Sequence, residues 1–432
     1  MSQTFAAAAF AASIGLLAVT QRRMVRGATR VPRNVVPVQL AWARATTPRE
    51  TASLTVSSRR LTLPPLPRAL SQVSVTKRLD RIATRLHRTD RAPRRGSVVP
   101  AAASPSPDAL PGRIPAARVP APDRTAPAPP SRVKVALCQL AVGADKPANI
   151  AGAREAILDA ARDGAALVVL PEMWNCPYAN ESFPAYAEVV ESVEDWTAPE
   201  SESESEPDSE SASPSIAMLS NAAKETGVVL VGGSIPERCA TTGALYNTCC
   251  VFSGDGSLVA KHRKTHLFDL DIPGEISFKE SDTLTQGESL TVVDTAVGRL
   301  GVGICFDVRF PEMASAMANR GAHVLVYPGA FNTVTGPLHW ELLQRARAVD
   351  TQCFVLTCSP ARMEGASYQA WGHSTAVGPF AEILATADER PTTVTATMEM
   401  EDIARRRRNM PLEHQRRGDL YALHDLDAET EK

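Results

Sequence analysis

The chain has 432 residues, of which 44% are hydrophobic and 22% are charged, and its formal net charge is −2. This near-neutral total combines two opposite parts: residues 1–130 contain 21 Lys and Arg but 5 Asp and Glu, whereas the remainder contains 25 and 43. The basic part has no nucleic-acid-binding pattern, and no later apolar run is long enough to cross a membrane. We therefore expect neither a nucleic-acid partner nor a stable membrane span.

The first 130 residues predict a targeting extension instead of a folded domain. An apolar run from Ala6 to Val19 precedes an Arg-rich, acid-poor stretch, which is typical of organelle transit peptides. The composition fits a two-part plastid address and also a mitochondrial presequence; a disordered tail on a cytoplasmic protein is the alternative. Ten prolines between residues 100 and 131 predict an extended linker. We expect residues 1–130 to be largely disordered and the targeting segment to be removed in the organelle.

Residues 131–425 alternate between strand-like apolar runs and helical periods, which predicts a layered α/β fold with helices outside the sheets. The expected strands are 133–140, 167–170, 228–234, 247–252, 258–264, 301–304, 324–327 and 354–357. The expected helices are 149–161, 216–225, 311–320 and 339–350. Residues 200–214 form an acidic, Ser-rich insertion. We expect it to be a disordered surface loop, either a passive insert or a site of serine phosphorylation.

Three reactive residues stand at the ends of strands that look buried: Glu172, Lys264 and Cys305. The cysteine lies where a strand turns into a helix, so we expect an exposed thiol near a helix N-terminus, which favours the thiolate. Singly, each residue has an ordinary explanation as a buried thiol, a turn carboxylate or a surface cation. Together they predict a cysteine nucleophile with a carboxylate base and an ammonium group beside it.

The motifs that contain these residues, LPEMW, HRKTHLFD and GICFDVRFPE, resemble those of the nitrilase (carbon–nitrogen hydrolase) superfamily in the same order. The resemblance extends over roughly residues 132 to 425. It implies a four-layer α-β-β-α sandwich that forms a homodimer through helices on one face. The helix His339–Asp350 is a candidate for that face, and we expect His339 and Trp340 in the core or an interface and not at the ligand.

The resemblance also implies a role for each residue. Glu172 is the general base that takes the thiol proton, and Cys305 attacks an amide carbonyl. Lys264 and the backbone N–H of Phe306 stabilise the tetrahedral oxyanion. Glu172 then protonates the leaving nitrogen, and water hydrolyses the thioester. Glu280 is expected to hold Lys264 and the attacking water, although a loop residue without such a role is the alternative.

This chemistry requires no metal and no organic cofactor. None of the eight cysteines forms a C-x-x-C pair, and no His/Cys cluster has the spacing of a zinc site. A domain of this size has its own core and does not need disulfides, and a reducing compartment suits a thiol nucleophile.

Longer stretches favour one branch of the superfamily. THLFDLDIPG at 265–274, the segment 327–341 and the segment 359–375, which contains SPAR and AWGHST, resemble ω-amidases. Members of that branch hydrolyse the terminal amide of 2-oxoglutaramate and 2-oxosuccinamate to the 2-oxo-dicarboxylate and ammonia. The nearest alternative is an amidase acting on deaminated glutathione. An alternative of another class is a catalytically silent scaffold of the same fold, against which the intact triad argues.

The small dianionic substrate needs a cation or several donors, because burying an unpaired charge is costly. Arg309, four residues after the cysteine, is the expected partner of the distal carboxylate. Tyr178 is a further expected donor, and Phe331 is expected to form an apolar wall. An ion pair between Arg309 and Glu312 and a purely packing role for Tyr178 are the alternatives.

Overall fold

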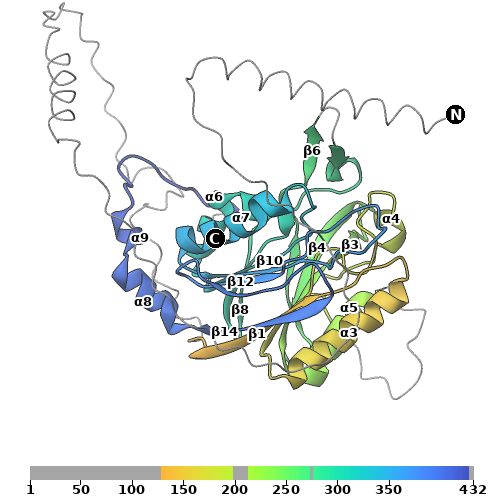
Figure 1. Cartoon of the computed structure of the whole chain (residues 1–432), viewed down its shortest axis with the longest axis horizontal. Coiled ribbons are helices and arrows are strands. Elements are labelled where there is room, and N and C mark those ends of the chain that lie inside the picture. Colours follow the sequence, from red (N-terminus) through yellow and green to blue (C-terminus); the bar gives the residue numbers. More distant parts are fainter. Residues whose placement is uncertain (1–127, 198–212, 273–275, 428–432) are drawn as a thin grey trace, which may run out of the picture. The chain divides into compact units, whose positions relative to one another are not determined.

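The computed structural model describes residues 128–197, 213–272 and 276–427. The predicted targeting extension lies outside the described residues except for 128–130. The acidic insertion also lies outside them except for 213–214. All the elements below lie between residues 132 and 415, and two large sheets are visible in Figure 1.

The first sheet has six strands in the order β14-β1-β2-β3-β4-β5. Strands β1, β2 and β3 are parallel, and the remaining pairings are antiparallel. Two helices, α3 (Lys146–Arg162) and α5 (Pro214–Thr226), pack on its outer face. The strand bounds are β1 (Arg132–Gln139), β2 (Leu167–Val169), β3 (Val229–Arg238), β4 (Leu245–Phe252), β5 (Leu258–Arg263) and β14 (Thr392–Glu399).

The second sheet also has six strands, in the order β13-β12-β11-β10-β9-β8. Its three central strands, β9 to β11, are parallel, and the outer pairings are antiparallel. Helices α6 (Pro311–Asn319) and α7 (Gly336–Thr351) cover its outer face. The strand bounds are β8 (Thr291–Thr295), β9 (Gly298–Val302), β10 (Val324–Pro328), β11 (Phe354–Cys358), β12 (Thr375–Val377) and β13 (Ile383–Thr386).

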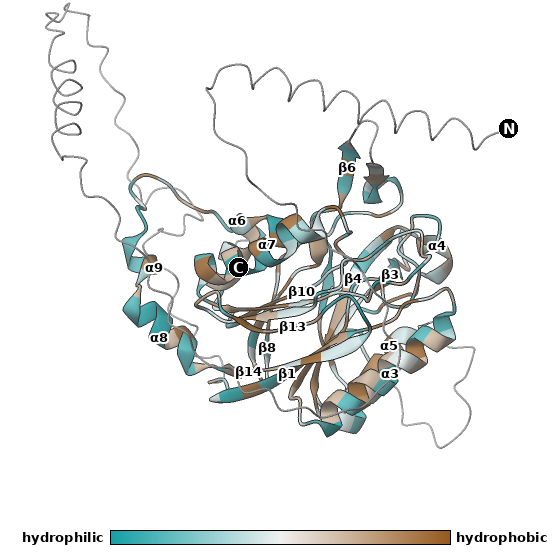
Figure 2. Cartoon of the chain, in the orientation of Figure 1, coloured by the Kyte–Doolittle hydropathy of each residue, from teal (hydrophilic) through white to brown (hydrophobic). Residues whose placement is uncertain are grey.

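The two sheets face each other, so the predicted four-layer α-β-β-α sandwich is confirmed. Alternate residues of one strand serve different layers: Val135 and Leu137 of β1 join the core between the sheets, whereas Ala136 and Cys138 pack toward the helices. Because both faces of the central strands are covered, their sequences read as continuous apolar runs. Figure 2 shows these hydrophobic strands inside and hydrophilic residues on the outer sides of the helices.

Local sequence signals set the helix ends. The side chain of Asp145 caps α3 by accepting a hydrogen bond from the Ala148 N–H at 3.0 Å. Helix α5 ends at Gly227, whose φ of +72° is the left-handed conformation that glycine adopts without strain. These signals agree with the predicted helices, which differ from the observed ones by a few residues at each end.

Smaller elements complete the described part of the chain. A hairpin of β6 and β7 projects from the large sheets, and the 3₁₀ turn η3 contains Cys305. No described helix is long and apolar enough to cross a membrane. The bounds are α4 (Phe183–Tyr186), β6 (Asp269–Ile272), β7 (Ile276–Lys279), η2 (Glu280–Asp282), η3 (Cys305–Arg309), α8 (Glu401–Asn409) and α9 (Leu412–Gln415).

Candidate active site

Three strand ends bring the predicted reactive residues together. Glu172 follows β2 and Lys264 follows β5, both in the first sheet, whereas Cys305 follows β9 in the second. All three side chains are buried, and their charges influence one another. The site therefore lies between the two sheets, beyond the carboxyl ends of the strands that carry it, where ligands commonly bind in α/β folds.

Lys264 is held between two carboxylates. Its Nζ donates to Glu172 Oε1 at 2.9 Å and to both oxygens of Glu280, at 2.9 and 2.8 Å. Glu280 also accepts the hydroxyl of Tyr178 at 2.6 Å and the backbone N–H of Phe268 at 2.7 Å. The ammonium position is thus fixed from two sides, which satisfies the requirement that a buried charge be paired.

Glu172 is partly paired and partly free. Its Oε1 accepts a second hydrogen bond from Asn247 Nδ2 at 2.8 Å, while Oε2 is buried without a hydrogen-bond partner in the described part of the chain. Burial raises the pKa of Glu172; Lys264 opposes this effect and Glu280 adds to it. The nearby thiol of Cys305 lowers the same pKa. A carboxyl with a free oxygen and a raised pKa is suited to exchange a proton.

Burial by itself would lower the pKa of Lys264, but the two glutamates outweigh it, and the pKa lies well above its ordinary range. Lys264 therefore remains an ammonium at every physiological pH. A fixed cation that does not exchange its proton is suited to stabilise negative charge and not to act as a base.

Cys305 lies on a sharp turn between β9 and η3, in the left-handed region with φ of +49°. The turn packs against the end of β10, where a Cβ added at Gly329 would come 3.2 Å from the Cα of Cys305. The residue after Glu172, Met173, has a similar φ of +51°. Such strained non-glycine residues cluster at functional sites, because the surrounding structure must hold them in place.

The prediction of an exposed thiol that favours the thiolate is wrong. Cys305 is buried, and burial is the main cause of a pKa well above the ordinary range, with Glu172 adding to it and Lys264 opposing it. Helix α6 begins only at Pro311, so Cys305 does not lie at its N-terminus. The raised pKa favours a neutral thiol at Cys305, beside the carboxyl of Glu172.

Asp307 is a positioning residue that the sequence analysis did not identify. Its buried carboxylate accepts the backbone N–H of Ile304 at 2.8 Å and both the N–H and Nδ1 of His266, at 2.9 and 2.7 Å. Nε2 of His262 lies 3.4 Å away. Burial alone would raise the pKa of Asp307, but the two histidines hold it well below its ordinary range. The carboxylate links the turn of Cys305 to the segment that carries Lys264. In the sequence, the two histidines that flank Lys264 were the signal from which this link could have been predicted.

Three of the four predicted substrate-binding residues lie beside Cys305, whereas Tyr178 lines a different cavity. Phe306, Arg309 and Phe331 line a small cavity beside the thiol, together with the ring of Tyr368. The Arg309 guanidinium lies over Phe331, with 4.6 Å between its Cζ and the ring centroid. Its Nη1 lies 3.1 Å from Nδ1 of His339, while its Nε is buried without a partner in the described part of the chain.

The structure bears on the alternative roles of Arg309 and Tyr178. Among the described residues, Arg309 contacts His339 and no carboxylate contributes to its pKa shift, so the alternative pairing with Glu312 is not formed. The hydroxyl of Tyr178 donates to Glu280, and its ring stacks on that of Tyr368 at 4.4 Å between centroids. Trp340 is buried as expected and packs against Phe331 at 4.9 Å.

A family model described as carbon–nitrogen hydrolase matches residues 134–408. The chain belongs to the carbon–nitrogen hydrolase family. It is therefore a hydrolase that acts on amides.

Two relatives of this carbon–nitrogen hydrolase carry a specific name. It is 56% identical over 301 residues to an Arabidopsis thaliana protein named chloroplastic omega-amidase, covering 69% of this chain and 77% of that protein. It is 47% identical over 290 residues to human omega-amidase NIT2, covering 67% of this chain and 97% of that protein. Among solved structures, Nit3 of Saccharomyces cerevisiae, a member of branch 10 of the nitrilase superfamily, is 44% identical with a TM-score of 0.58, over 66% of this chain and 97% of that one.

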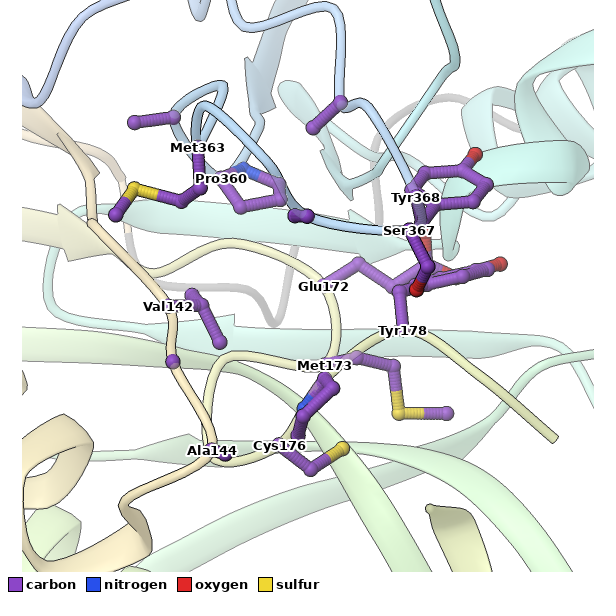
Figure 3. A pocket seen from close by; sticks show the side chains of 15 residues that line it. Val142, Ala144, Glu172, Met173, Cys176, Tyr178, Pro360, Met363, Ser367 and Tyr368 are labelled. Carbon is purple, nitrogen blue, oxygen red and sulfur yellow. The ribbon is translucent and has the colours of Figure 1, made fainter. Parts of the chain in front are cut away.

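The carbon–nitrogen hydrolase has a second, larger cavity, which shares Tyr368 as a lining residue with the smaller one. It measures about 240 Å³ and is bordered by Glu172 and by the loops at 142–144, 173–178 and 360–370. Figure 3 shows the two tyrosines, Tyr178 and Tyr368, at one end of it and Val142 and Met363 at the other. Glu172 lines this cavity, whereas Cys305 lines the smaller one.

Among the described residues, no group of three or more His, Cys, Asp or Glu side chains is arranged to hold a metal ion. All eight cysteines are free, and seven of them are buried.

Proposed function

We propose that this carbon–nitrogen hydrolase is an ω-amidase, which converts 2-oxoglutaramate or 2-oxosuccinamate and water to 2-oxoglutarate or oxaloacetate and ammonia. The observation that carries the proposal is the buried cluster of Glu172, Lys264, Glu280 and Cys305. Its support beyond the geometry is the identity of 46–56% to proteins named omega-amidase. An amidase needs a nucleophile, a proton carrier and an oxyanion partner, and the cluster offers one residue for each.

In the proposed mechanism, the neutral thiol of Cys305 passes its proton to Glu172 as the sulfur attacks the amide carbonyl. The ammonium of Lys264 and the backbone N–H of Phe306 stabilise the oxyanion that forms. Glu172 returns the proton to the nitrogen, the C–N bond breaks, and ammonia leaves behind a thioester on Cys305. Water then gives a proton to Glu172 and attacks the thioester, which releases the carboxylate product and the free thiol.

Glu280 has no free oxygen atom in this arrangement, since both accept hydrogen bonds. We infer that it acts as a positioning residue for Lys264. Tyr178 takes part through Glu280 and as a wall of the site, and its engaged hydroxyl argues against a direct bond to the substrate carboxylate.

The distal carboxylate of the substrate is proposed to bind Arg309. The guanidinium is close to Cys305, has an unpaired Nε and is held between aromatic rings. A cation without a carboxylate partner in a desolvated pocket favours an anionic ligand, because the ligand supplies the missing charge. Phe331 supports the guanidinium and forms an apolar wall.

Ammonia release by the purified full-length protein tests the activity, with 2-oxoglutaramate, 2-oxosuccinamate and deaminated glutathione compared at equal concentration. We expect preference for the 2-oxo-dicarboxylic acid monoamides and no turnover by Cys305→Ala. Preference for deaminated glutathione would assign the protein to that sister activity with the same mechanism. No turnover of any amide would favour the silent-scaffold alternative.

Arg309→Ala tests the carboxylate partner. We expect KM for 2-oxoglutaramate to rise at least about ten-fold, since a charged hydrogen bond is worth roughly 1.5–3 kcal/mol, with a smaller change for an uncharged amide. Arg132→Ala, which removes an exposed arginine paired with Glu399 at the edge of the first sheet, is the matched control. An equal effect of Arg309→Ala on both substrates would refute the assignment.

We also propose a homodimer that forms through α7. Leu338 and Leu342, one helical turn apart, are 66% and 63% exposed. An exposed apolar pair on a helix that otherwise packs on its own sheet favours a protein partner.

For the location, we propose a plastid. The basic, acid-poor composition of residues 1–130 and the similarity to a protein named chloroplastic omega-amidase support it. A fusion of residues 1–130 to a fluorescent protein should accumulate in plastids; accumulation in mitochondria or the cytosol would contradict the proposal.

A further inference from the structure

Two cavities of different character meet at Tyr368. The smaller one, of about 10 Å³, contains Cys305 and Arg309, and the larger one, of about 240 Å³, contains Glu172. The hydroxyl of Tyr368 donates to the Ala330 carbonyl, which holds the ring between them. The smaller void has room for about one water molecule, so the substrate must widen it, whereas the larger one is already open.

The proposed chemistry gives the two cavities different roles. The acyl carbon becomes bonded to Cys305, and its carboxylate points to Arg309, so the acyl part occupies the smaller cavity. The leaving nitrogen receives its proton from Glu172 and therefore lies on the side of the larger cavity. A hydrogen atom on that nitrogen needs no space, but an alkyl group in its place would extend beyond Glu172 into the larger cavity.

We propose that the larger cavity is a leaving-group pocket and that the enzyme also hydrolyses N-alkyl amides of 2-oxo-dicarboxylic acids. This inference rests on the proposed function. The overall reaction is N-alkyl amide plus water to carboxylic acid plus alkylamine. The thiol proton of Cys305 passes through Glu172 to the departing nitrogen, and water restores the thiol.

The lining of the pocket selects a neutral, short substituent. Its far end carries the side chains of Val142 and Met363, and among the described residues Glu172 is the only charged side chain that lines it. The hydroxyls of Tyr178 and Tyr368 are both engaged as donors elsewhere. A peptide-like leaving group that ends in a carboxylate would find no cation among the lining residues, so its charge would stay unpaired.

The test compares kcat/KM of the full-length protein for 2-oxoglutaramate and its N-propyl derivative, with 2-oxoglutarate formation as the readout for both. Val142→Phe fills the far end of the cavity. We expect it to lower the ratio of N-propyl to primary amide kcat/KM at least about ten-fold, because a pocket that loses space for a few methylenes discriminates by 10–200-fold. Val193→Phe, at an exposed valine that lines neither cavity, is the matched control and should leave the ratio unchanged.

Met363→Ala provides a second variant that does not depend on tolerance of a large side chain. It enlarges the same end of the cavity, so we expect the kcat/KM for an N-hexyl amide to rise relative to the kcat/KM for the primary amide. Hydrolysis of 2-oxoglutaramate without any hydrolysis of the N-propyl amide would overturn the inference and leave the proposed function intact. An equal loss for both substrates in Val142→Phe would show that the cavity holds the acyl part, which also overturns it. If the unmodified protein hydrolyses neither amide, the proposed function itself is refuted.

Discussion

At the residue scale, the site places one ammonium between two carboxylates and a thiol. Only one of the two negative charges of Glu172 and Glu280 is balanced by Lys264, and burial penalises the remainder. Burial is the main cause of the raised pKa values of Glu172 and Cys305, and the charge of Glu280 adds to both. A thiolate would add a further buried negative charge. In the proposed mechanism, the sulfur therefore becomes nucleophilic when Glu172 accepts its proton during attack.

The raised pKa of Glu172 predicts the acid side of the pH profile. Glu172 must be ionised to accept the thiol proton, and a raised pKa keeps the carboxyl protonated to a higher pH. We expect kcat/KM to fall on acidification with a midpoint above about 4.3, the ordinary value for glutamate. Asn247→Ala removes a hydrogen-bond donor to the ionised form of Glu172, so the midpoint of this variant should lie at a still higher pH. A midpoint at or below the ordinary value would contradict the account.

At the element scale, parallel strands with both faces covered were the most predictable part of the fold. Their apolar runs identified β1, β2, β9, β10 and β11 within a few residues. Strands β8 and β14 were missed because few of their residues are buried and few carry large apolar side chains, so little alternation appears in the sequence itself. The hairpin β6–β7 and the short strands β12 and β13 were missed as well, since strands of three or four residues carry little periodicity.

The proximity of the three candidate residues could also be predicted. Residue types at strand ends indicated that Glu172, Lys264 and Cys305 lie together, and the structure places them together although they come from two sheets. Their catalytic roles stay a prediction. Sequence could not reveal the burial of Cys305 or the role of Asp307, since both depend on packing between segments distant in the chain.

Glu188 gives a test of how the outer helices are fixed. Its buried carboxylate accepts the backbone N–H groups of Ser215 and Ile216 at the start of α5 and pairs with Lys146 at the start of α3, 2.7 Å away. Glu188→Ala should lower the free energy of unfolding by about 2–3 kcal/mol, because it leaves buried donors without a charged partner. Urea denaturation followed by circular dichroism measures this.

The control for this measurement is Glu225→Ala, which breaks the exposed pair with Arg154. That change should cost less than about 1 kcal/mol. Equal effects of the two substitutions would show that Glu188 does not anchor the helices.

At the scale of the whole molecule, α7 links the site to the proposed dimer face. Trp340 on its inner side packs against Phe331, and His339 contacts Arg309, while Leu338 and Leu342 remain exposed. Association through this helix would support Phe331, which forms a wall of the smaller cavity. The same helix would then serve both the assembly and the substrate pocket.

Replacing both leucines by glutamate tests this arrangement. Leu338→Glu with Leu342→Glu should convert a dimer into a monomer, because two carboxylates would have to be buried in the interface. Light scattering coupled to size exclusion measures the mass of each form. Leu420→Glu, at an exposed leucine near the C-terminus, is the control and should stay dimeric. A double variant that remains dimeric would exclude α7 as the interface.

Detection of the acyl-enzyme tests the central claim most directly. The full-length protein is mixed with 2-oxoglutaramate, quenched in acid within milliseconds to seconds, digested and analysed by mass spectrometry. The account predicts a 2-oxoglutaryl thioester on the peptide that contains Cys305, formed together with ammonia and absent in Cys305→Ala. Two results would contradict the account. One is that Cys305→Ala still releases ammonia although it forms no adduct; the other is that the active protein carries the adduct on a different cysteine.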